Sequence, residues 1–368
     1  MMAEYIPHPT RNRCFRSARK HARDRRASFL PWALLVLVWG AGCTKPVDPR
    51  GAATVPVYYA TTRAPLDNPR NPDAAFGPRA SDPQVVAYGR ATVEIAPPKP
   101  SITAYDPPLD SRPGWSPGEF YREVRGQFSN SRPLIVYIHG FNNTFATAAH
   151  RAAIFARELQ PDVAPRPAIY SWASASKALA YLKDEETALL NQENIRRFLN
   201  KLSHEGGTTP LVLIGHSLGA RAVTYALRDI SLIRAGQIDP RRPMFAHLIL
   251  LEPDVNRAYF RQNIVRARAL CGQVTIYASS RDRALGLSTF LHNYSRLGEL
   301  SSDLAEKVDV IDASAVRSDL FGHAYDQPVL FEDIRALIRG KSPSERANHT
   351  LEKDSAQGVY RLLATPRT

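Results

Sequence analysis

A serine in the sequence Gly-His-Ser-Leu-Gly, at residues 215–219, has the surroundings of a nucleophile. The apolar run at residues 211–214 predicts a buried strand before it, and residues 220–234 have a helical pattern. A serine in a sharp turn between a strand and a helix is lifted out of the sheet, and its hydroxyl lies near the positive end of the helix dipole. The pattern therefore predicts that Ser217 attacks a carbonyl carbon in an acyl-transfer reaction.

Acyl transfer also needs hydrogen-bond donors for the oxyanion that forms during the attack. The apolar run at residues 134–138 predicts another buried strand, which leads into the turn His-Gly-Phe-Asn at residues 139–142. We expect the backbone N–H groups of Leu218 and Phe141 to form the oxyanion hole. His139 precedes the nucleophile in the chain, so we interpret its side chain as structural rather than as the base.

The base is expected after the nucleophile in the chain, and four histidines follow the serine: His247, His292, His323 and His349. His247 opens an apolar run that predicts a strand, His292 lies in a helical pattern, and His349 lies in a polar segment. His323 lies in a loop after the last predicted strand, at residues 308–311. We therefore predict that His323 is the general base.

Two aspartates stand where an acid could orient that imidazole. Asp282 comes shortly after the apolar run at residues 274–278, and Asp254 comes after the run at residues 248–251. We prefer Asp282 as the acid and keep Asp254 as the alternative. Each aspartate also has a structural interpretation. Asp282 could form a salt bridge with the neighbouring arginines. Asp254 could cap the helix expected to begin near residue 257.

The hydrophobic periodicity predicts an α/β fold with a mostly parallel central sheet. From residue 134 on, apolar strand runs alternate with helical patterns, which favours parallel strands with helices on both faces of the sheet. Residues 55–61 and 88–95 predict an antiparallel pair at the N-terminal edge of the sheet. The proline-rich segments 65–83 and 97–117 are expected to be surface loops.

Several short motifs accompany the serine turn and His323 along the chain. They read Tyr-Ala-Thr-Thr-Arg at 59–63, Tyr-Gly-Arg-Ala at 88–91, His-Gly-Phe-Asn at 139–142, Tyr-Ser-Trp at 170–172, Pro-Asp-Val at 253–255 and Ala-Ser-Ser-Arg-Asp at 278–282. Together they resemble the bacterial α/β-hydrolase family called domain of unknown function 900, over residues 55–340. The resemblance implies the α/β-hydrolase fold and esterase- or lipase-like chemistry. In that fold the acid usually follows the seventh strand, which is why Asp282 is preferred, whereas some lipases use the sixth, which would be Asp254.

The N-terminal region has the pattern of an export signal. An arginine-rich stretch precedes the apolar run at residues 29–39, which is too short to span a bilayer comfortably. The run closes with Gly-Ala-Gly before Cys43, which resembles a bacterial lipoprotein cleavage site and predicts lipidation of Cys43. Thr44 follows the cysteine, a pattern typical of lipoproteins anchored in the outer membrane. We expect the protein to face the periplasm from that anchor, or to be a periplasmic protein if Cys43 is not acylated.

These observations divide the chain into four parts. They are a lipoprotein-like signal peptide at 1–42, a tether at 43–54, an α/β-hydrolase domain at 55–340 and a polar C-terminal tail at 341–368, in which residues 360–363 could dock on the domain.

The composition bears on whether the protein binds nucleic acid, a metal or a cofactor. The formal charge is +13, but residues 1–42 carry a net +6, and the remaining charge is spread through the chain without the basic cluster that a nucleic-acid role needs. Of the three cysteines, only Cys271 would remain as a thiol, and it is expected to be a small buried residue without a disulfide. No constellation of cysteines and histidines suggests a metal, and we predict no cofactor. The sequence predicts no particular oligomeric state.

The sequence as a whole predicts a serine hydrolase that acts on small-molecule or lipid carboxylic esters through an acyl-enzyme. His323 would take the proton of Ser217, and water would later repeat the cycle on the acyl-enzyme. Phe141, Trp172 and Tyr181 are expected either to line the acyl pocket or to pack in the core. The alternative is a non-catalytic envelope binding protein that keeps the hydrolase scaffold.

Overall fold

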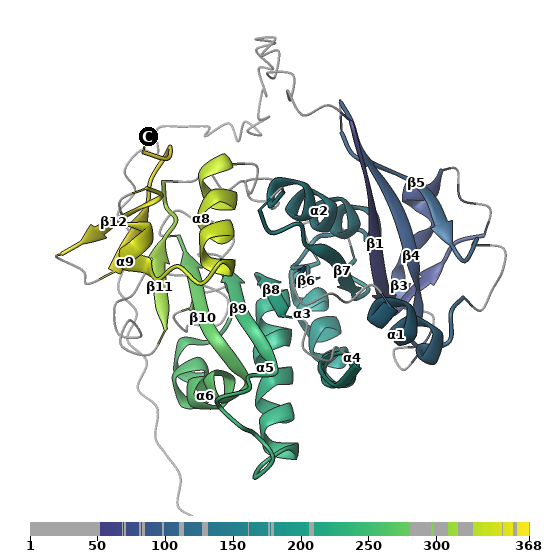
Figure 1. The fold of residues 1–368 in the computed structure, drawn as a ribbon. Coiled ribbons are helices and arrows are strands. Elements are labelled where there is room, and N and C mark those ends of the chain that lie inside the picture. The colour runs from purple at the N-terminus through teal and green to yellow at the C-terminus, as the bar shows by residue number, and fades with distance from the viewer. Residues whose placement is uncertain are drawn as a thin grey trace, which may run out of the picture. The chain divides into compact units, whose positions relative to one another are not determined.

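The computed structural model describes residues 52–67, 69, 71–80, 82, 85–97, 99–109, 114–126, 132–160, 162–175, 177, 180–205, 210–279, 296–297, 308–315, 327–347, 349–355 and 359–367 (Figure 1). The sheet strands are β1 (Ala53–Thr61), β4 (Ala87–Ile95), β5 (Ser101–Asp106), β6 (Leu134–Ile138), β7 (Arg166–Ser171), β8 (Leu211–His216), β9 (Phe245–Leu251), β10 (Cys271–Ala278), β11 (Asp309–Asp312), β12 (Leu351–Asp354) and β13 (Val359–Leu362). A small second sheet contains β2 (Arg63–Pro65) and β3 (Phe76–Ala80). The helices are α1 (Pro117–Gly126), α2 (Phe145–Glu158), α3 (Tyr181–Leu190), α4 (Gln192–Glu205), α5 (Leu218–Ile233), α6 (Arg257–Leu270), α8 (Pro328–Ile338) and α9 (Pro343–Arg346), with the 3-10 helix η1 (Pro72–Ala74).

The described strands form an 11-stranded sheet in the order β12-β13-β11-β10-β9-β8-β6-β7-β1-β4-β5. All neighbours from β13 to β1 are parallel. At the N-terminal edge, β1 and β4 are antiparallel, with a register that runs from Ala53 opposite Ile95 to Thr61 opposite Ala87. The predicted fold class and the predicted antiparallel edge are therefore both confirmed.

Both faces of the sheet are covered by helices, as Figure 1 shows. Every residue of β6 and β8 is buried, which is why these strands read as continuous apolar runs. Within β8, Leu211 and Leu213 join the core formed with α4, α5 and α6, while Val212 and Ile214 join the core formed with α2 and α8. Alternate side chains of one strand thus hold two helical layers to the sheet.

The order of the strands places a topological switch point at β6. After β6, the chain crosses through α2 to β7 on one side, and then returns through α3 and α4 to β8 on the other side of β6. The connections from β6 and β8 therefore leave the sheet in opposite directions. Ligands of open α/β sheets bind in the crevice outside the carboxyl ends of such strands.

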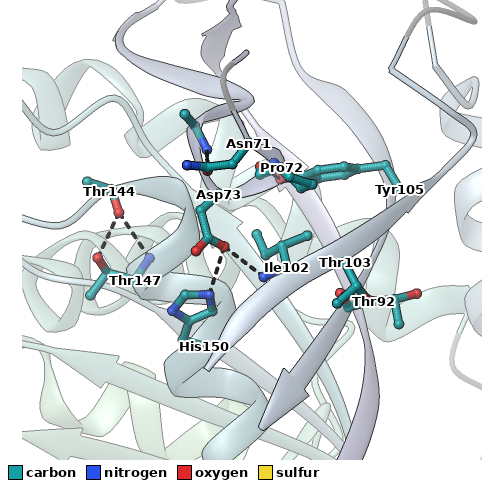
Figure 2. Close-up of polar contacts among 11 residues, drawn as sticks. Asn71, Pro72, Asp73, Thr92, Ile102, Thr103, Tyr105, Thr144, Thr147 and His150 are labelled. Atoms are coloured by element: carbon teal, nitrogen blue, oxygen red, sulfur yellow. Dashed lines mark hydrogen bonds and ion pairs between the residues drawn. The ribbon is translucent and has the colours of Figure 1, made fainter. Parts of the chain in front are cut away.

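Both proline-rich segments that the sequence predicts as loops contain ordered elements as well. η1 and β3 lie in the first segment, and β5 extends the antiparallel edge in the second. Figure 2 shows how they are tied to α2: one oxygen of Asp73 lies 2.7 Å from the backbone nitrogen of Ile102 and 3.0 Å from Nε2 of His150. The Tyr105 hydroxyl donates to the carbonyl of Pro72 at 2.9 Å. These contacts come from distant parts of the chain, so local proline content does not indicate them.

The C-terminal residues join the central sheet, whereas the sequence predicts a separate polar tail from residue 341 on. β13 pairs in parallel with β11, so the predicted docking of residues 360–363 corresponds to a strand. Leu351 and Leu362 are fully buried in the core under α2 and α8. The hydrophobic pattern does not indicate these strands, because β12 and β13 are short and place only end residues in the core.

Several predictions fall outside the described residues. The signal peptide at 1–42, Cys43 and nearly all of the tether lie there. Cys271 is described, and it is a buried thiol whose pKa is raised by burial. Over the part of the chain that the structure describes, no helix combines the length and the apolar character needed to cross a bilayer.

Candidate active site

Ser217 lies in the turn between β8 and α5, where its backbone has an unusual conformation. Its φ and ψ are 49° and −120°, a region that residues other than glycine rarely occupy. Its N–H donates to the carbonyl of Leu251 at 3.0 Å, and its carbonyl accepts from the N–H groups of Ala220 at 3.0 Å and Asp254 at 3.2 Å. Ser217 is half-buried, whereas both neighbouring residues are buried. The surrounding bonds thus hold a strained turn that leaves the serine side chain partly accessible.

Two glycines allow this turn to pack against the end of β6. A Cβ on Gly219 would lie 2.2 Å from the carbonyl oxygen of Ile138 and 2.5 Å from that of His139, so a side chain cannot be accommodated there. A Cβ on Gly140 would lie 2.8 Å from the Cβ of Ser217. The turn that follows β6 is therefore in contact with the serine, as the switch point requires.

The two N–H groups predicted to form an oxyanion hole belong to these two turns. Leu218 is the first residue of α5, where backbone N–H groups have no acceptor within the helix. In the other turn, the carbonyl of Phe141 accepts from Nδ2 of Asn143 at 2.8 Å, and Asn142 has a left-handed φ of 56°. Within the described residues, neither the Phe141 N–H nor the Leu218 N–H has an acceptor. Both groups can therefore donate to a ligand oxygen.

His139 is a structural residue in this arrangement, in line with its interpretation from the sequence. Its side chain is fully buried and stacks on Trp172, with ring centroids 4.9 Å apart and an angle of 18° between the planes. Burial, reinforced by the positive charge of Arg63, lowers the pKa of His139 to about 3. Its Nδ1 lies 2.8 Å from the carbonyl oxygen of Gly140, which assigns the ring proton to Nδ1. A neutral, buried imidazole of this kind orders the turn but does not act as the base.

Asp254, the alternative acid, lies beneath the serine turn and is 1% exposed. Its Oδ1 lies 3.0 Å from Nη2 of Arg221 and 3.2 Å from Nε of Arg296. Its Oδ2 accepts a hydrogen bond from the Tyr181 hydroxyl. The proposal that Asp254 caps the next helix is wrong, because Asn256 caps α6 by accepting from the N–H of Tyr259 at 2.9 Å.

Arg221 is a residue of this site to which the sequence pattern gave no role. It donates from Nε to the carbonyl of Asp254 at 2.7 Å, and its Nη1 forms an ion pair with Glu185 of α3. The nearby carboxylates raise its pKa above the ordinary value, although burial acts in the opposite direction. Its place four residues after Ser217, one turn along α5, is the signal that could have located it.

The aromatic residues predicted as pocket walls or core differ in their burial. Trp172 is fully buried and donates from its indole nitrogen to the carbonyl of His139 at 2.8 Å, so it packs in the core. Phe141 is half-buried and meets Tyr181 edge to face, with centroids 5.5 Å apart. Near Tyr181, α3 and α5 border a pocket of about 350 Å³. Apolar and charged side chains both line it: Leu182, Glu185, Glu186, Ala188, Leu189, Gln192, Arg221, Ala222 and Tyr225.

The preferred acid Asp282 and the predicted base His323 lie outside the described residues. The strands that precede them are described: β10 ends at Ala278, and its parallel neighbour β11 ends at Asp312. In the described ranges, no group of three or more histidine, cysteine or acidic side chains is placed to hold a metal ion.

No curated protein matches the chain. Among solved structures, the chain is similar to the esterase domain of a Rhodothermus marinus protein, with 13% identity and a TM-score of 0.32 over 78% of this chain and 98% of that one. It is also similar to TT1662 from Thermus thermophilus, with 14% identity and a TM-score of 0.34 over 57% of this chain and 88% of that one.

The match to a protein family covers more than half of the chain and includes both turns of the site. Residues 119–326 match the family described as "Alpha/beta hydrolase of unknown function (DUF900)". The strand order, the switch point and the turn that holds Ser217 are those of an α/β hydrolase. The chain therefore belongs to the DUF900 family of α/β hydrolases.

Proposed function

We propose that this protein is a serine hydrolase that cleaves carboxylic esters, with Ser217 as the nucleophile, His323 as the general base and Asp282 as the acid that orients it. One observation carries the proposal: Ser217 is half-buried in a strained turn directly against Gly140. Two N–H groups without acceptors, from Phe141 and Leu218, come from the same two turns. This combination supports covalent catalysis with a preformed oxyanion hole.

The proposed reaction has two halves. In the first, the Ser217 oxygen bonds to the ester carbonyl carbon while His323 takes the hydroxyl proton, and the carbonyl oxygen becomes an oxyanion that accepts from Phe141 and Leu218. The carbon–oxygen bond to the alcohol then breaks, and His323 returns the proton to the departing alcohol. In the second half, water attacks the acyl-enzyme with His323 again as base, which releases the acid and restores the serine.

The positions of β10 and β11 support the choice of base and acid. Both strands are parallel to β8, so the segments that follow them start at the same edge of the sheet as the Ser217 turn. Asp282 comes four residues after the end of β10, and His323 comes after β11. The chain order serine, aspartate, histidine is the one that this architecture uses.

The proposed substrate is a small-molecule or lipid ester with an apolar acyl group. The pocket of about 350 Å³ between α3 and α5 supports it, because Leu182, Leu189 and Tyr225 give it apolar walls beside its charged residues. Arg221, which borders this pocket, lies one helical turn after Ser217. If the acyl chain lies there, Ala222→Phe should shift the preference among esters of graded chain length toward shorter chains.

We also propose that the protein works in the bacterial cell envelope, as an outer-membrane lipoprotein acylated at Cys43 and facing the periplasm. The arginine-rich stretch, the apolar run at residues 29–39 and the small residues before Cys43 support this location. An anchored enzyme would meet lipid esters at the membrane surface. No nucleic acid or cofactor enters the proposed reaction.

The decisive experiment combines a fluorophosphonate probe with hydrolysis of p-nitrophenyl acyl esters. The wild type should be labelled and should hydrolyse the esters, and Ser217→Ala should lose both activities, with a fall in rate of several orders of magnitude. Ser231→Ala is the matched control, because Ser231 is a buried serine of α5, the helix that begins directly after Ser217. Labelling of the Ser217→Ala protein would assign the nucleophile elsewhere. A folded wild type with neither activity would favour the non-catalytic binding protein.

A further inference from the structure

Arg63 is a charged residue buried behind the turn that follows β6. It is the first residue of β2, two positions after the end of β1, is 1% exposed and belongs to the motif Tyr-Ala-Thr-Thr-Arg. The sequence gives this arginine no function, since a charged residue after a strand is ordinarily solvated. Taking a guanidinium out of water is costly unless its N–H groups find acceptors. Its hydrogen bonds therefore indicate what the buried charge does.

Four acceptors surround the guanidinium, and they come from strand β3, from the turn after β6 and from the end of β7 with the residues that follow it. Nε donates to the Ser171 hydroxyl at 2.9 Å, at the end of β7. Nη1 donates to the carbonyls of Gly77 and Ser174, each at 3.2 Å. Nη2 donates to the carbonyl of Asn143 at 2.6 Å, in the turn after β6. A planar fork of N–H groups can satisfy these directions at once, whereas a lysine ammonium cannot.

A second route leads from Arg63 to the same turn through two side chains. The Ser171 hydroxyl, which accepts from Arg63, lies 3.3 Å from Nε2 of His139. Since the His139 proton lies on Nδ1 toward the Gly140 carbonyl, the Ser171 hydroxyl donates to Nε2. The chain of hydrogen bonds thus runs from Arg63 through Ser171 and His139 to Gly140, the residue against Ser217.

Asp184 of α3 secures the other side of the turn and compensates the charge. It is fully buried, and it accepts from the N–H of Asn142 at 3.3 Å, from the N–H of Ala175 at 2.6 Å and from the Ser174 hydroxyl. Burial lowers the pKa of Arg63 to about 9, and the negative charge of Asp184 opposes that shift. Both charged groups therefore hold residues 142–143, one residue beyond Phe141.

We propose that Arg63 is a positioning residue of the oxyanion hole: by holding the Asn143 carbonyl and the Ser171–His139–Gly140 chain, it fixes the turn that aims the Phe141 N–H at the reacting carbonyl oxygen. This inference rests on the proposed function of Ser217 and Phe141. Arg63 itself touches no reacting atom. Its side chain is buried and donates to the carbonyl of Asn143 in the turn, to two further backbone carbonyls and to the Ser171 hydroxyl, which suits a role in geometry.

The test compares Arg63→Lys, which keeps the charge but not the fork, with the wild type and with Arg346→Lys. Arg346 is an equally buried arginine, 2% exposed, that pairs with Asp333 and has no contact with the turn. With p-nitrophenyl butyrate, and with active sites counted by fluorophosphonate titration, Arg63→Lys should lower kcat about a hundredfold and leave KM within about threefold. The inhibition constant of an alkyl trifluoromethyl ketone, whose adduct carries an oxyanion, should rise in parallel. Arg346→Lys should change none of these values per titrated site.

Amide hydrogen exchange of residues 139–145 supplies a readout that does not depend on catalysis. Exchange should be faster in Arg63→Lys than in the wild type and unchanged in Arg346→Lys. If Arg63→Lys is folded, with unaltered exchange and with kcat within about threefold of the wild type, the proposal is wrong. If exchange responds but the wild type neither labels nor hydrolyses esters, the proposed function fails while the hold of Arg63 on the turn stands.

Should Arg63→Lys fail to fold, Ser171→Ala takes its place, because it removes one oxygen between Arg63 and His139 and leaves the guanidinium intact. We expect a fall in kcat of about tenfold, with weaker binding of the trifluoromethyl ketone and little change in KM. An unchanged kcat and unchanged ketone binding in that variant would overturn the proposal.

Discussion

Asp254 lies beside the turn of Ser217, and described residues contact both oxygens of its carboxylate. Two guanidinium groups face Oδ1, and the Tyr181 hydroxyl donates to Oδ2. The acid of a triad must accept the Nδ1 proton of the base and stabilise the imidazolium that forms. A carboxylate between two arginines stabilises a further cation less than one without them. We therefore keep Asp282 as the proposed acid and expect Asp254 to have a structural role beneath the turn.

We predict opposite effects for the two aspartates. Asp282→Asn should lower kcat by about ten-thousandfold without a large change in stability, because it removes the group that orients the base. Asp254→Asn should lower the free energy of unfolding by about 3–5 kcal/mol, because it leaves buried arginines without their carboxylate, while kcat per titrated active site stays within about tenfold. Urea unfolding and active-site titration measure both effects. The reverse result, with Asp254→Asn inactive and Asp282→Asn active, would assign the acid to Asp254.

His139 makes the stability depend on pH in a defined direction. Its pKa is lowered to about 3 in the folded protein, whereas an unfolded histidine titrates near 6.5. Between these values the unfolded chain binds more protons, so acidification from pH 6.5 toward pH 3 lowers the free energy of unfolding. Between pH 7 and pH 4, the wild type should lose roughly 3 kcal/mol more than His139→Asn, as measured by urea unfolding. Equal losses in the two proteins would show that His139 is not buried in the neutral form.

At the scale of elements, the C-terminal strands are held to the sheet by a buried ionic cluster as well as by backbone pairing. Asp333 of α8 is fully buried and pairs with Arg346 of α9. It also accepts from the Tyr277 hydroxyl of β10 at 2.7 Å and from the Thr350 hydroxyl just before β12. The Asp333 carboxylate thus connects α8 and α9 with β10 and with the residue just before β12. The segment after residue 340 stabilises the domain through this cluster.

The cost of removing one member of this pair should depend on whether the other member is present. We predict that Arg346→Met and Asp333→Leu each lower the free energy of unfolding by about 3–5 kcal/mol, because each leaves a buried charge without its partner. The double variant should lose clearly less than the sum of the two. Glu352→Gln is the control, since the pair of Glu352 with Arg367 is half-exposed and should contribute less than about 1 kcal/mol. Strictly additive losses in urea unfolding would contradict a coupled pair.

At the scale of the whole molecule, the proposed active site and the proposed membrane anchor depend on different residues of the chain. The argument for Ser217 uses residues from β6 onward, whereas the argument for export uses only residues before β1. Acylation of the N-terminal cysteine with two or more chains gives stable membrane attachment, which one chain cannot provide. The two proposals can therefore be tested independently.

For the location, we predict that the mature protein is found in the bacterial membrane fraction, with Cys43 acylated and residues 1–42 removed. Cys43→Ser should accumulate as an uncleaved precursor, which intact-mass measurement distinguishes from the wild type. Cys271→Ser is the matched control and should be processed normally, because Cys271 is a buried thiol of the folded domain. A soluble wild type with an unmodified N-terminus would rule out the lipoprotein and leave the hydrolase proposal intact.

The amino-acid pattern alone predicted the buried strands β6, β8, β9, β10 and β11 and the turns that follow β6 and β8. Continuous apolar runs such as Leu134–Ile138 predict buried parallel strands, because both faces of the sheet are covered. The Gly-His-Ser-Leu-Gly turn is readable because its glycines and its place between strand and helix are local features. Local sequence patterns were sufficient to predict structure wherever the backbone conformation depends on residues that are close in the sequence.

The partners of the buried polar groups and the role of the C-terminal strands became known from the three-dimensional fold. Arg63 bonds to Ser171 across 108 positions, and Tyr181 bonds to Asp254 across 73. Nothing near Arg63 or Asp254 in the sequence indicates these partners, because a buried charge is satisfied by whichever groups the fold brings to it. β12 and β13 likewise form because they pair with each other and with β11, since strands this short have little stability alone. The local sequence motif thus located Ser217, and long-range contacts determined which groups surround it.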